Sequence, residues 1–259
     1  MTYKRAYIEI TNACNRRCAF CPPHHRPERY LSPPEFAHIL DAAAPFVRHL
    51  YFHLKGEPLL HPRVADMAAL AQRRGFFVNL TTNGDLLGRR PGLYRHLRQL
   101  NVSLHGHEDP EPLVERLITV RDAHPALRIC LRLWDGGRGA GAPALKRFGL
   151  SAGHGPRATL GENLFLSRAD PFEWPDLSRP PLWPEGYCHG LSQQFGVLVS
   201  GDVTPCCLDG EGDIPLGNIF TQNLSEILSS PRSAAIREGF RRRTAVEALC
   251  RTCSYKNRF

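Results

Sequence analysis

The chain has 259 residues, a length that suits one mid-sized domain or a domain with a small appendage. Its hydrophobic content of 42% is ordinary for a protein with a buried core, and no run of 18 apolar residues predicts a membrane-spanning helix. The opening residues, MTYKRAYIEI, lack the apolar segment of a secretory signal, so we expect a cytoplasmic protein with no membrane partner. The net charge of +8 is spread along the chain, which fits an ordinary basic protein, and the alternative is an anionic partner such as a phosphorylated substrate, a nucleotide or RNA. No aromatic stacking face or RNA-binding motif accompanies the charge, so a nucleic-acid partner is not expected.

Strands and helices alternate through the first half of the sequence. The predicted strands cover residues 6–10, 50–54, 76–81, 101–104 and 129–134. The predicted helices cover residues 33–47, 63–74, 91–98 and 111–123. Ser32 and Glu35 form a capping box at the start of the first helix. This alternation predicts an α/β fold of parallel βα units, here an open, partial (β/α)6 barrel of the TIM type.

The composition changes after residue 135. Residues 136–187 are dense in Gly and Pro, which predicts an irregular bridging region that covers the substrate. A β-hairpin is predicted from residue 194 and a helix over residues 223–242. We therefore predict a barrel core at 1–135, the bridging region at 136–187 and a small C-terminal domain at 188–259.

Nine cysteines are many for a cytoplasmic chain, where disulfides are rare, so they point to metal binding or catalysis. Cys14, Cys18 and Cys21 form a C-x3-C-x2-C loop directly after the first predicted strand. Three thiolates can hold three irons of a cubane cluster and leave the fourth iron open to a small chelating molecule. The alternative is a zinc knuckle completed by His24 or His25, although zinc motifs favour C-x2-C pairs.

The segment TNACNRRCAFC resembles the signature loop of the radical S-adenosylmethionine (SAM) enzymes, and the resemblance extends over most of residues 6–134. It implies a 4Fe–4S cluster on the three cysteines, with SAM chelated by the open iron. Reductive cleavage of SAM would give a 5′-deoxyadenosyl radical that abstracts a substrate hydrogen atom. The resemblance also implies a flavodoxin- or ferredoxin-type electron donor.

The same resemblance assigns SAM-binding roles along the chain. The implied cofactor-binding residues are Phe20, Gly56, Glu57, Thr82, Asn83 and Ser103. Gly56 and Glu57 match the segment that receives the methionine amino group, although Lys55 stands where many members have a second glycine. Thr82, Asn83 and Ser103 match positions that approach the ribose or the methionine carboxylate.

Two further residues are candidate catalytic groups: His105, at the carboxyl end of the fourth predicted strand, and Arg132, within the fifth. His105 could contact the substrate or accept a proton, and the alternative is a loop histidine without a role. Arg132 could meet a carboxylate or phosphate inside the barrel, and the alternative is an outward-facing arginine.

The C-terminal cysteines could form a second metal site, with Cys188, Cys206, Cys250 and Cys253 as its ligands. The pattern Cys188-x12-Gly201-x4-Cys206 followed by C-x2-C resembles the twitch domain, a shortened relative of the SPASM domain. That resemblance implies one auxiliary 4Fe–4S cluster, which would anchor substrate or accept an electron. Cys207 leaves the choice of ligand open, and a structural zinc is the alternative.

Several reactions fit this architecture. The length and C-terminal spacing resemble the aminocyclitol dehydrogenases of the twitch group, which implies an oxidoreductase acting on a small polar substrate. HLKGEPLLHP, LTTNG and NVSLHG are faintly similar to segments of queuosine lyases, which implies a lyase acting on a nucleoside. A peptide-modifying maturase is a third alternative, and a zinc-stabilised nucleic-acid-binding module is the alternative from another class.

Overall fold

The structure is a computed structural model that describes residues 2–22, 25–105, 107, 111–134, 146 and 157–259. The chain forms two compact units. The first unit comprises Met1–Cys14, Cys21–Gly56 and Phe172–Phe259, and the second comprises Asn15–Phe20 and Glu57–Pro171. His24 and most of residues 136–156 lie outside the described residues.

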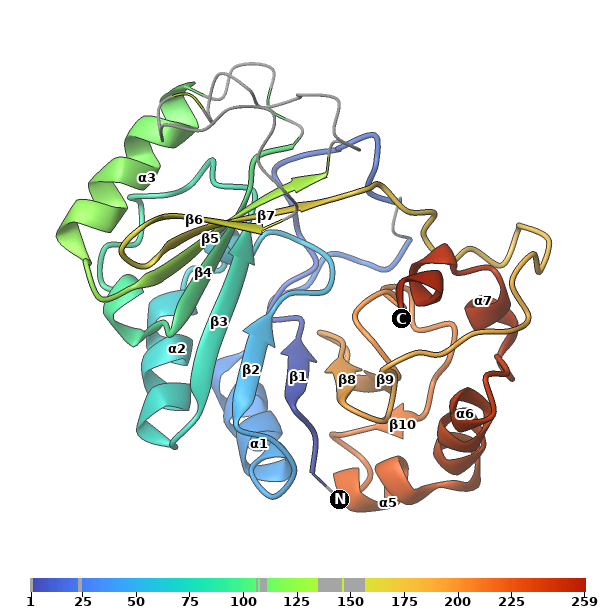
Figure 1. The fold of residues 1–259 in the computed structure, drawn as a ribbon. Coiled ribbons are helices and arrows are strands. Elements are labelled where there is room, and N and C mark those ends of the chain that lie inside the picture. The colour runs from blue at the N-terminus through green and yellow to red at the C-terminus, as the bar shows by residue number, and fades with distance from the viewer. Residues whose placement is uncertain (1, 23–24, 106, 108–110, 135–145, 147–156) are drawn as a thin grey trace. The chain divides into compact units, whose positions relative to one another are not determined.

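The first unit contains strands in the order β10-β9-β8-β1-β2 (Figure 1). The central strand β1 (Arg5–Ile8) is parallel to β2 (His49–Phe52) and to β8 (Gln194–Val197). β9 (Asp202–Thr204) runs antiparallel to β8, and β10 (Gly217–Asn218) antiparallel to β9. Segments nearly 190 residues apart in the sequence therefore share one sheet.

Helix α1 (Pro33–Ala43) begins where the sequence predicts, because both halves of the Ser32–Glu35 capping box are formed. It buries Phe36 against Phe52 of β2, with ring centroids 5.5 Å apart. The helix predicted over 223–242 is two helices, α5 (Leu224–Ser229) and α6 (Pro231–Arg241). Ser230 ends the first and caps the second, and Pro231 suits only a first helical position because it has no N–H. The chain continues through α7 (Ala248–Arg251) and a 3₁₀ helix, η3 (Ser254–Arg258).

The second unit has strands in the order β3-β4-β5-β7-β6, with α2 and α3 against one face (Figure 1). β3 (Phe77–Thr82), β4 (Gln99–Ser103), β5 (Arg128–Trp134) and β7 (Leu164–Ala169) are parallel, and β6 (Arg157–Gly161) is antiparallel to β7. The helices are α2 (Val64–Arg73) and α3 (Glu111–Ala123), with 3₁₀ turns η1 (Pro58–Leu60) and η2 (Tyr94–His96). Only η2 stands where a short helix over 91–98 was expected.

The parallel strands joined by helices confirm the α/β class. The expectation of irregular structure throughout 136–187 is wrong for β6 and β7. Leu164 and Leu166 alternate into the core there, and Asn163 turns the hairpin at a φ of 55°. The described residues contain no helix long and apolar enough to cross a membrane.

Candidate cofactor and iron–sulfur sites

The loop with Cys14, Cys18 and Cys21 joins β1 to α1 and is closed at its base. Asn12 donates from Nδ2 to the Pro27 carbonyl (2.9 Å) and accepts from the Arg29 amide (2.7 Å). Thr11 donates to the Arg29 carbonyl (2.8 Å). The three cysteines are at least partly exposed, so their thiols can meet a group outside the core.

Past Cys21 the loop is fixed by an ion pair whose carboxylate is buried. Both terminal nitrogens of Arg26 donate to Glu9 of the first unit, at 2.7 and 2.8 Å. The Glu9 carboxylate also accepts the Val199 amide (2.9 Å), and Arg26 Nε donates to the Gly210 carbonyl (2.9 Å). Arg26 thus ties the cysteine loop to the segment that follows Cys206 and Cys207. Sequence reasoning missed this link because its partners are far apart along the chain.

The Cys18 portion of the loop is held within the second unit. Arg16 donates to both oxygens of Asp85, at 2.5 and 2.7 Å, and its guanidinium contacts His107 Nδ1 at 3.0 Å. Asn15 joins Asp85 and Asn83 through its side-chain amide, at 2.9 Å each. Burial would raise the pKa of Asp85, but the Arg16 bonds outweigh it and hold that pKa below its usual value. The end of β3 therefore positions this part of the loop.

Gly56 follows β2 in a left-handed conformation, with a φ of 75°. A Cβ there would collide with the backbone of Thr11 and Asn12, so only glycine lets these segments approach. Lys55 is buried, and its Nζ donates to the Pro22 carbonyl at 2.5 Å. Its stem lies against Gly210, where a Cβ would come within 2.7 Å of Lys55 Cε. The lysine in place of a second glycine therefore has its own partners in the first unit.

Glu57 organises the end of β3 in the second unit. Its carboxylate accepts from Thr82 Oγ1 (2.8 Å), the Asn83 amide (2.8 Å) and the Leu59 amide (2.9 Å). An ionised carboxylate has about four acceptor positions, so one more donor can still bind. Burial raises the pKa of Glu57 to about 7, against the opposing effect of these hydrogen bonds. Glu57, Thr82 and Asn83, predicted separately, thus share one hydrogen-bonded cluster.

We expect replacement of Glu57 by glutamine to flatten the pH dependence of stability in the metal-free protein. Between pH 4.5 and about 7, native Glu57 holds a proton that the unfolded chain has lost, so stability falls as pH rises through this range. A shift of this size corresponds to about 3 kcal/mol, a contribution that Glu57→Gln removes. Urea unfolding at pH 5 and pH 8 measures it, with the exposed Glu226→Gln as control. An equal fall in the free energy of unfolding from pH 5 to pH 8 in the wild type and in Glu57→Gln would contradict the expectation.

One face of β4, β5 and β7 carries polar groups. On β5, Ile129, Leu131 and Leu133 are fully buried, whereas Arg132 points to the other, half-buried face. Ser103 pairs in register with Arg132, which pairs with Ser167 on β7. Ser103 and Arg132, both predicted site residues, are therefore neighbours on one face. Ser167 was missed because its strand was not predicted.

His105 lies in an aromatic stack after β4. Its ring is parallel to that of Trp134 (centroids 4.7 Å apart, 7° between planes), and Phe20 meets it edge-on at 4.7 Å. Burial, followed by the charge of Arg132, lowers the pKa of His105 to about 4, so the imidazole is neutral at pH 7. Its buried Nδ1 has no hydrogen-bond partner among the described residues. This nitrogen is available to a bound group.

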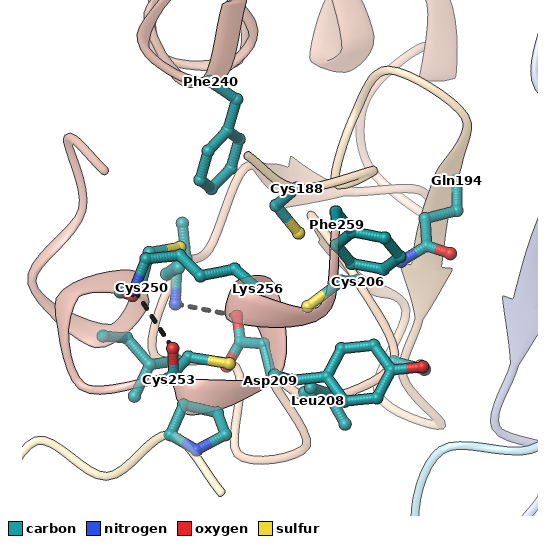
Figure 2. Close-up of a pocket in the computed structure, with 15 residues that line it drawn as sticks. Cys188, Gln194, Cys206, Leu208, Asp209, Phe240, Cys250, Cys253, Lys256 and Phe259 are labelled. Atoms are coloured by element: carbon teal, nitrogen blue, oxygen red, sulfur yellow. Dashed lines mark hydrogen bonds between the residues drawn. The ribbon is translucent and has the colours of Figure 1, made fainter. Parts of the chain in front are cut away.

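The four predicted C-terminal cysteines line one pocket of the first unit (Figure 2). Cys188 precedes β8 and Cys206 follows β9. Cys250 lies in α7, and Cys253 lies just after this helix. Burial raises the pKa of Cys188 to about 11 and also raises those of Cys206 and Cys250, and neighbouring cysteines add to each shift. Cationic iron would compensate thiolates gathered in this way.

Cys206 and Cys207 differ in their surroundings, although both line the pocket. Cys188 and Cys250 act on the pKa of Cys206. Cys207 packs against a cluster that contains Tyr7 and Leu54, and it also acts on the pKa of Tyr7. Cys207 also acts on the pKa of Cys188, but Cys206 is influenced by both Cys188 and Cys250, which favours Cys206 as the ligand.

Two charged side chains accompany these thiols and were not foreseen. Lys256 is 2% exposed, and its Nζ donates to the carbonyls of Cys250 (2.9 Å) and Cys253 (3.1 Å). Asp209 is also buried and accepts the Asp213 and Ile214 amides at 2.8 and 3.0 Å. Burial raises the pKa of Asp209 to about 6.

The donor sets fit iron–sulfur clusters. No group of three or more His, Cys, Asp and Glu in the described part of the chain is arranged around a single metal ion. In a tetranuclear cluster each thiolate binds a different iron, so the sulfurs surround the cluster instead of meeting at one point. An α/β fold with a three-cysteine loop after its first strand and a separate four-cysteine pocket defines an iron–sulfur protein.

The chain matches two family models. Residues 8–134 match the radical SAM superfamily, and residues 188–254 match SPASM, an iron–sulfur cluster-binding domain. The chain therefore belongs to the radical SAM superfamily and is an enzyme with a SPASM domain. Its cofactors are SAM with the 4Fe–4S cluster that binds it, and auxiliary iron–sulfur in the C-terminal domain.

Individual relatives cover parts of the chain. A tungsten-containing aldehyde ferredoxin oxidoreductase cofactor-modifying protein of Pyrococcus furiosus is 35% identical over 122 residues, which are 45% of this chain and 34% of the relative. An S-adenosylmethionine-dependent nucleotide dehydratase of Selenomonas ruminantium is 33% identical over 89 residues, 34% of this chain and 32% of the relative. The chain spans about a third of the length of these curated relatives.

A solved structure shares this fold over nearly the whole length of the chain. BtrN in complex with AdoMet and 2-DOIA superimposes with a TM-score of 0.69 and 18% identity. The match covers 98% of this chain and 94% of BtrN. At this identity the likeness establishes the fold.

Proposed function

We propose that this enzyme dehydrogenates a carbinol carbon of a small polar substrate. The pocket formed by Cys188, Cys206, Cys250 and Cys253 supports this most strongly, because a cluster bound by four thiolates has no iron left to bind a ligand and suits electron transfer. When bound, SAM and the N-terminal cluster would supply a 5′-deoxyadenosyl radical able to remove one hydrogen atom, and an auxiliary cluster held by the four C-terminal cysteines would be able to accept the remaining electron. We propose Cys14, Cys18 and Cys21 as the ligands of the N-terminal cluster.

The chain's own residues account for SAM and substrate binding in this proposal. The carboxylate of Glu57 has room for one more donor, which would be the methionine ammonium. Gly56 lets its segment approach the backbone of Thr11 and Asn12. Asn83 and Ser103 would contact other polar parts of SAM. Arg132 would hold a polar group of the substrate on the half-buried face of β5.

His105 would take the hydroxyl proton, which completes the loss of two hydrogens from the substrate. The buried Nδ1 supports this role, because it has no hydrogen-bond partner among the described residues and can accept the hydroxyl hydrogen. We expect His105→Ala to slow formation of oxidised product by about 10²–10⁴-fold, the usual contribution of a general base. Formation of 5′-deoxyadenosine without product should continue. Liquid chromatography of both compounds measures this ratio, and equal losses of the two would contradict the assignment.

The SAM-dependent nucleotide dehydratase among the relatives favours a second candidate, a nucleoside-type substrate. Carbinol-deuterated aminocyclitols and sugar-deuterated nucleotides distinguish the two candidates when each is incubated with reduced holoenzyme and SAM. The dehydrogenase proposal expects deuterium in 5′-deoxyadenosine from an aminocyclitol, with a ketone product that has lost two hydrogens. Transfer from the nucleotides alone would support the second candidate.

Two further features belong to this proposal. A flavodoxin- or ferredoxin-type donor would supply the electron that starts each reaction, and the net charge of +8 favours a donor with an acidic surface. We also propose that residues 1–135 hold the radical chemistry, that 136–187 bridge and cover the substrate, and that 188–259 hold the auxiliary cluster.

A further inference from the structure

Lys256 is a buried cation beside the C-terminal cysteine pocket (Figure 2). Its ammonium donates to the backbone carbonyls of Cys250 and Cys253. Its stem passes Gly186, where a Cβ would lie 3.3 Å from three of its carbons, and Nζ lies 6.0 Å from the ring centroid of Trp183. Several independent contacts therefore hold this side chain in one place.

A buried ammonium is unfavourable unless nearby negative charge compensates it. Its hydrogen-bonding partners among the described residues are neutral carbonyls, and no described carboxylate forms an ion pair with it. The nearby Asp209 already accepts two backbone amides. The thiols of Cys188, Cys250 and Cys253 share the pocket with Lys256 and supply the missing negative charge once they bind iron.

An iron–sulfur cluster held by four thiolates is anionic and gains one further negative charge when it is reduced. A fixed cation nearby stabilises the reduced form more than the oxidised form, and the low local dielectric strengthens the effect. We propose that Lys256 is a positioning residue that acts through the auxiliary cluster and makes it a better electron acceptor. This inference rests on the proposed function, because it requires iron–sulfur in the C-terminal pocket.

The test uses the full chain with Cys14, Cys18 and Cys21 replaced by alanine, so that only the auxiliary cluster contributes a signal. In this background, Lys256→Gln and Lys256→Met remove the charge, and Lys256→Arg keeps it. Arg258→Gln removes an exposed cation two residues away, which stacks on Phe172 and Tyr255, and serves as the matched control. Redox titration followed by electron paramagnetic resonance gives the midpoint potential of each variant, and iron and sulfide assays give its cluster content.

We expect the ratio of reduced to oxidised cluster at a fixed ambient potential to fall in both neutral variants to about one tenth of that in the background protein, or lower. This corresponds to a midpoint potential about 59 mV or more below that of the background protein for a one-electron couple. Lys256→Arg and Arg258→Gln should stay close to the background protein. An unchanged potential in either neutral variant with full cluster content would overturn the proposal. Loss of the cluster from both would assign Lys256 a structural role and would also overturn it. Zinc, or no metal, in the background protein would instead contradict the proposed function.

Discussion

Simultaneous replacement of Cys14, Cys18 and Cys21 by alanine should reduce formation of 5′-deoxyadenosine to background. The loop is closed at its base by Asn12 and Thr11, and it presents partly exposed thiols after β1. Without these thiolates the chain cannot hold the cluster that reduces SAM. Incubation of reconstituted protein with dithionite and SAM, followed by liquid chromatography, measures the loss.

The matched control is Cys130→Ala, which removes a thiol from β5 outside both cysteine groups. Its activity should stay near that of the wild type, since burial raises the pKa of Cys130 and keeps the thiol protonated. Normal SAM cleavage by the triple variant would show that the radical arises elsewhere in the protein.

Replacement of Cys206 by alanine should remove the auxiliary cluster and leave SAM cleavage intact. Cys188 and Cys250 lie close enough to act on the pKa of Cys206, as expected for thiols that share one cluster. The variant should lose about four irons per chain. Product formation should fall with them, because the substrate radical then has no internal electron acceptor. Iron assays and product analysis on the same preparation measure both effects.

Cys207→Ala is the control for this experiment, because it removes the adjacent thiol. Cys207 packs against the cluster containing Tyr7 and Leu54, so its loss should cost about 1 kcal/mol of stability and no iron. The reverse pattern, with iron lost from Cys207→Ala and retained in Cys206→Ala, would make Cys207 the ligand.

Local sequence signals predicted the parts of the fold that depend on neighbouring residues. The capping box of α1 is formed as expected, because Ser32 and Glu35 are three residues apart. Hydrophobic alternation located the strands of the core. β6 and β7 were missed because dense Gly and Pro around them obscured the short alternation of Leu164 and Leu166.

The parts of the site that depend on distant partners could not be read from the sequence. Arg16 and Asp85 are 69 residues apart, and neither belongs to a motif. Lys256 resembles any basic residue of a polar tail until the fold buries it beside Cys250 and Cys253. The cysteine patterns were informative because the ligands of one cluster must lie close together. Short spacings along the chain, as in C-x3-C-x2-C and C-x2-C, bring cysteines close together whatever the rest of the fold.

The central claim is that the chain holds one cluster in each cysteine group. Iron and acid-labile sulfide, measured after anaerobic reconstitution in wild type and in the Cys14/Cys18/Cys21→Ala variant, test it most directly. We predict about eight irons in the wild type and about four in the variant. Four irons in the wild type, none in the variant and zinc in both would contradict the account, since the C-terminal site would then accept no electron.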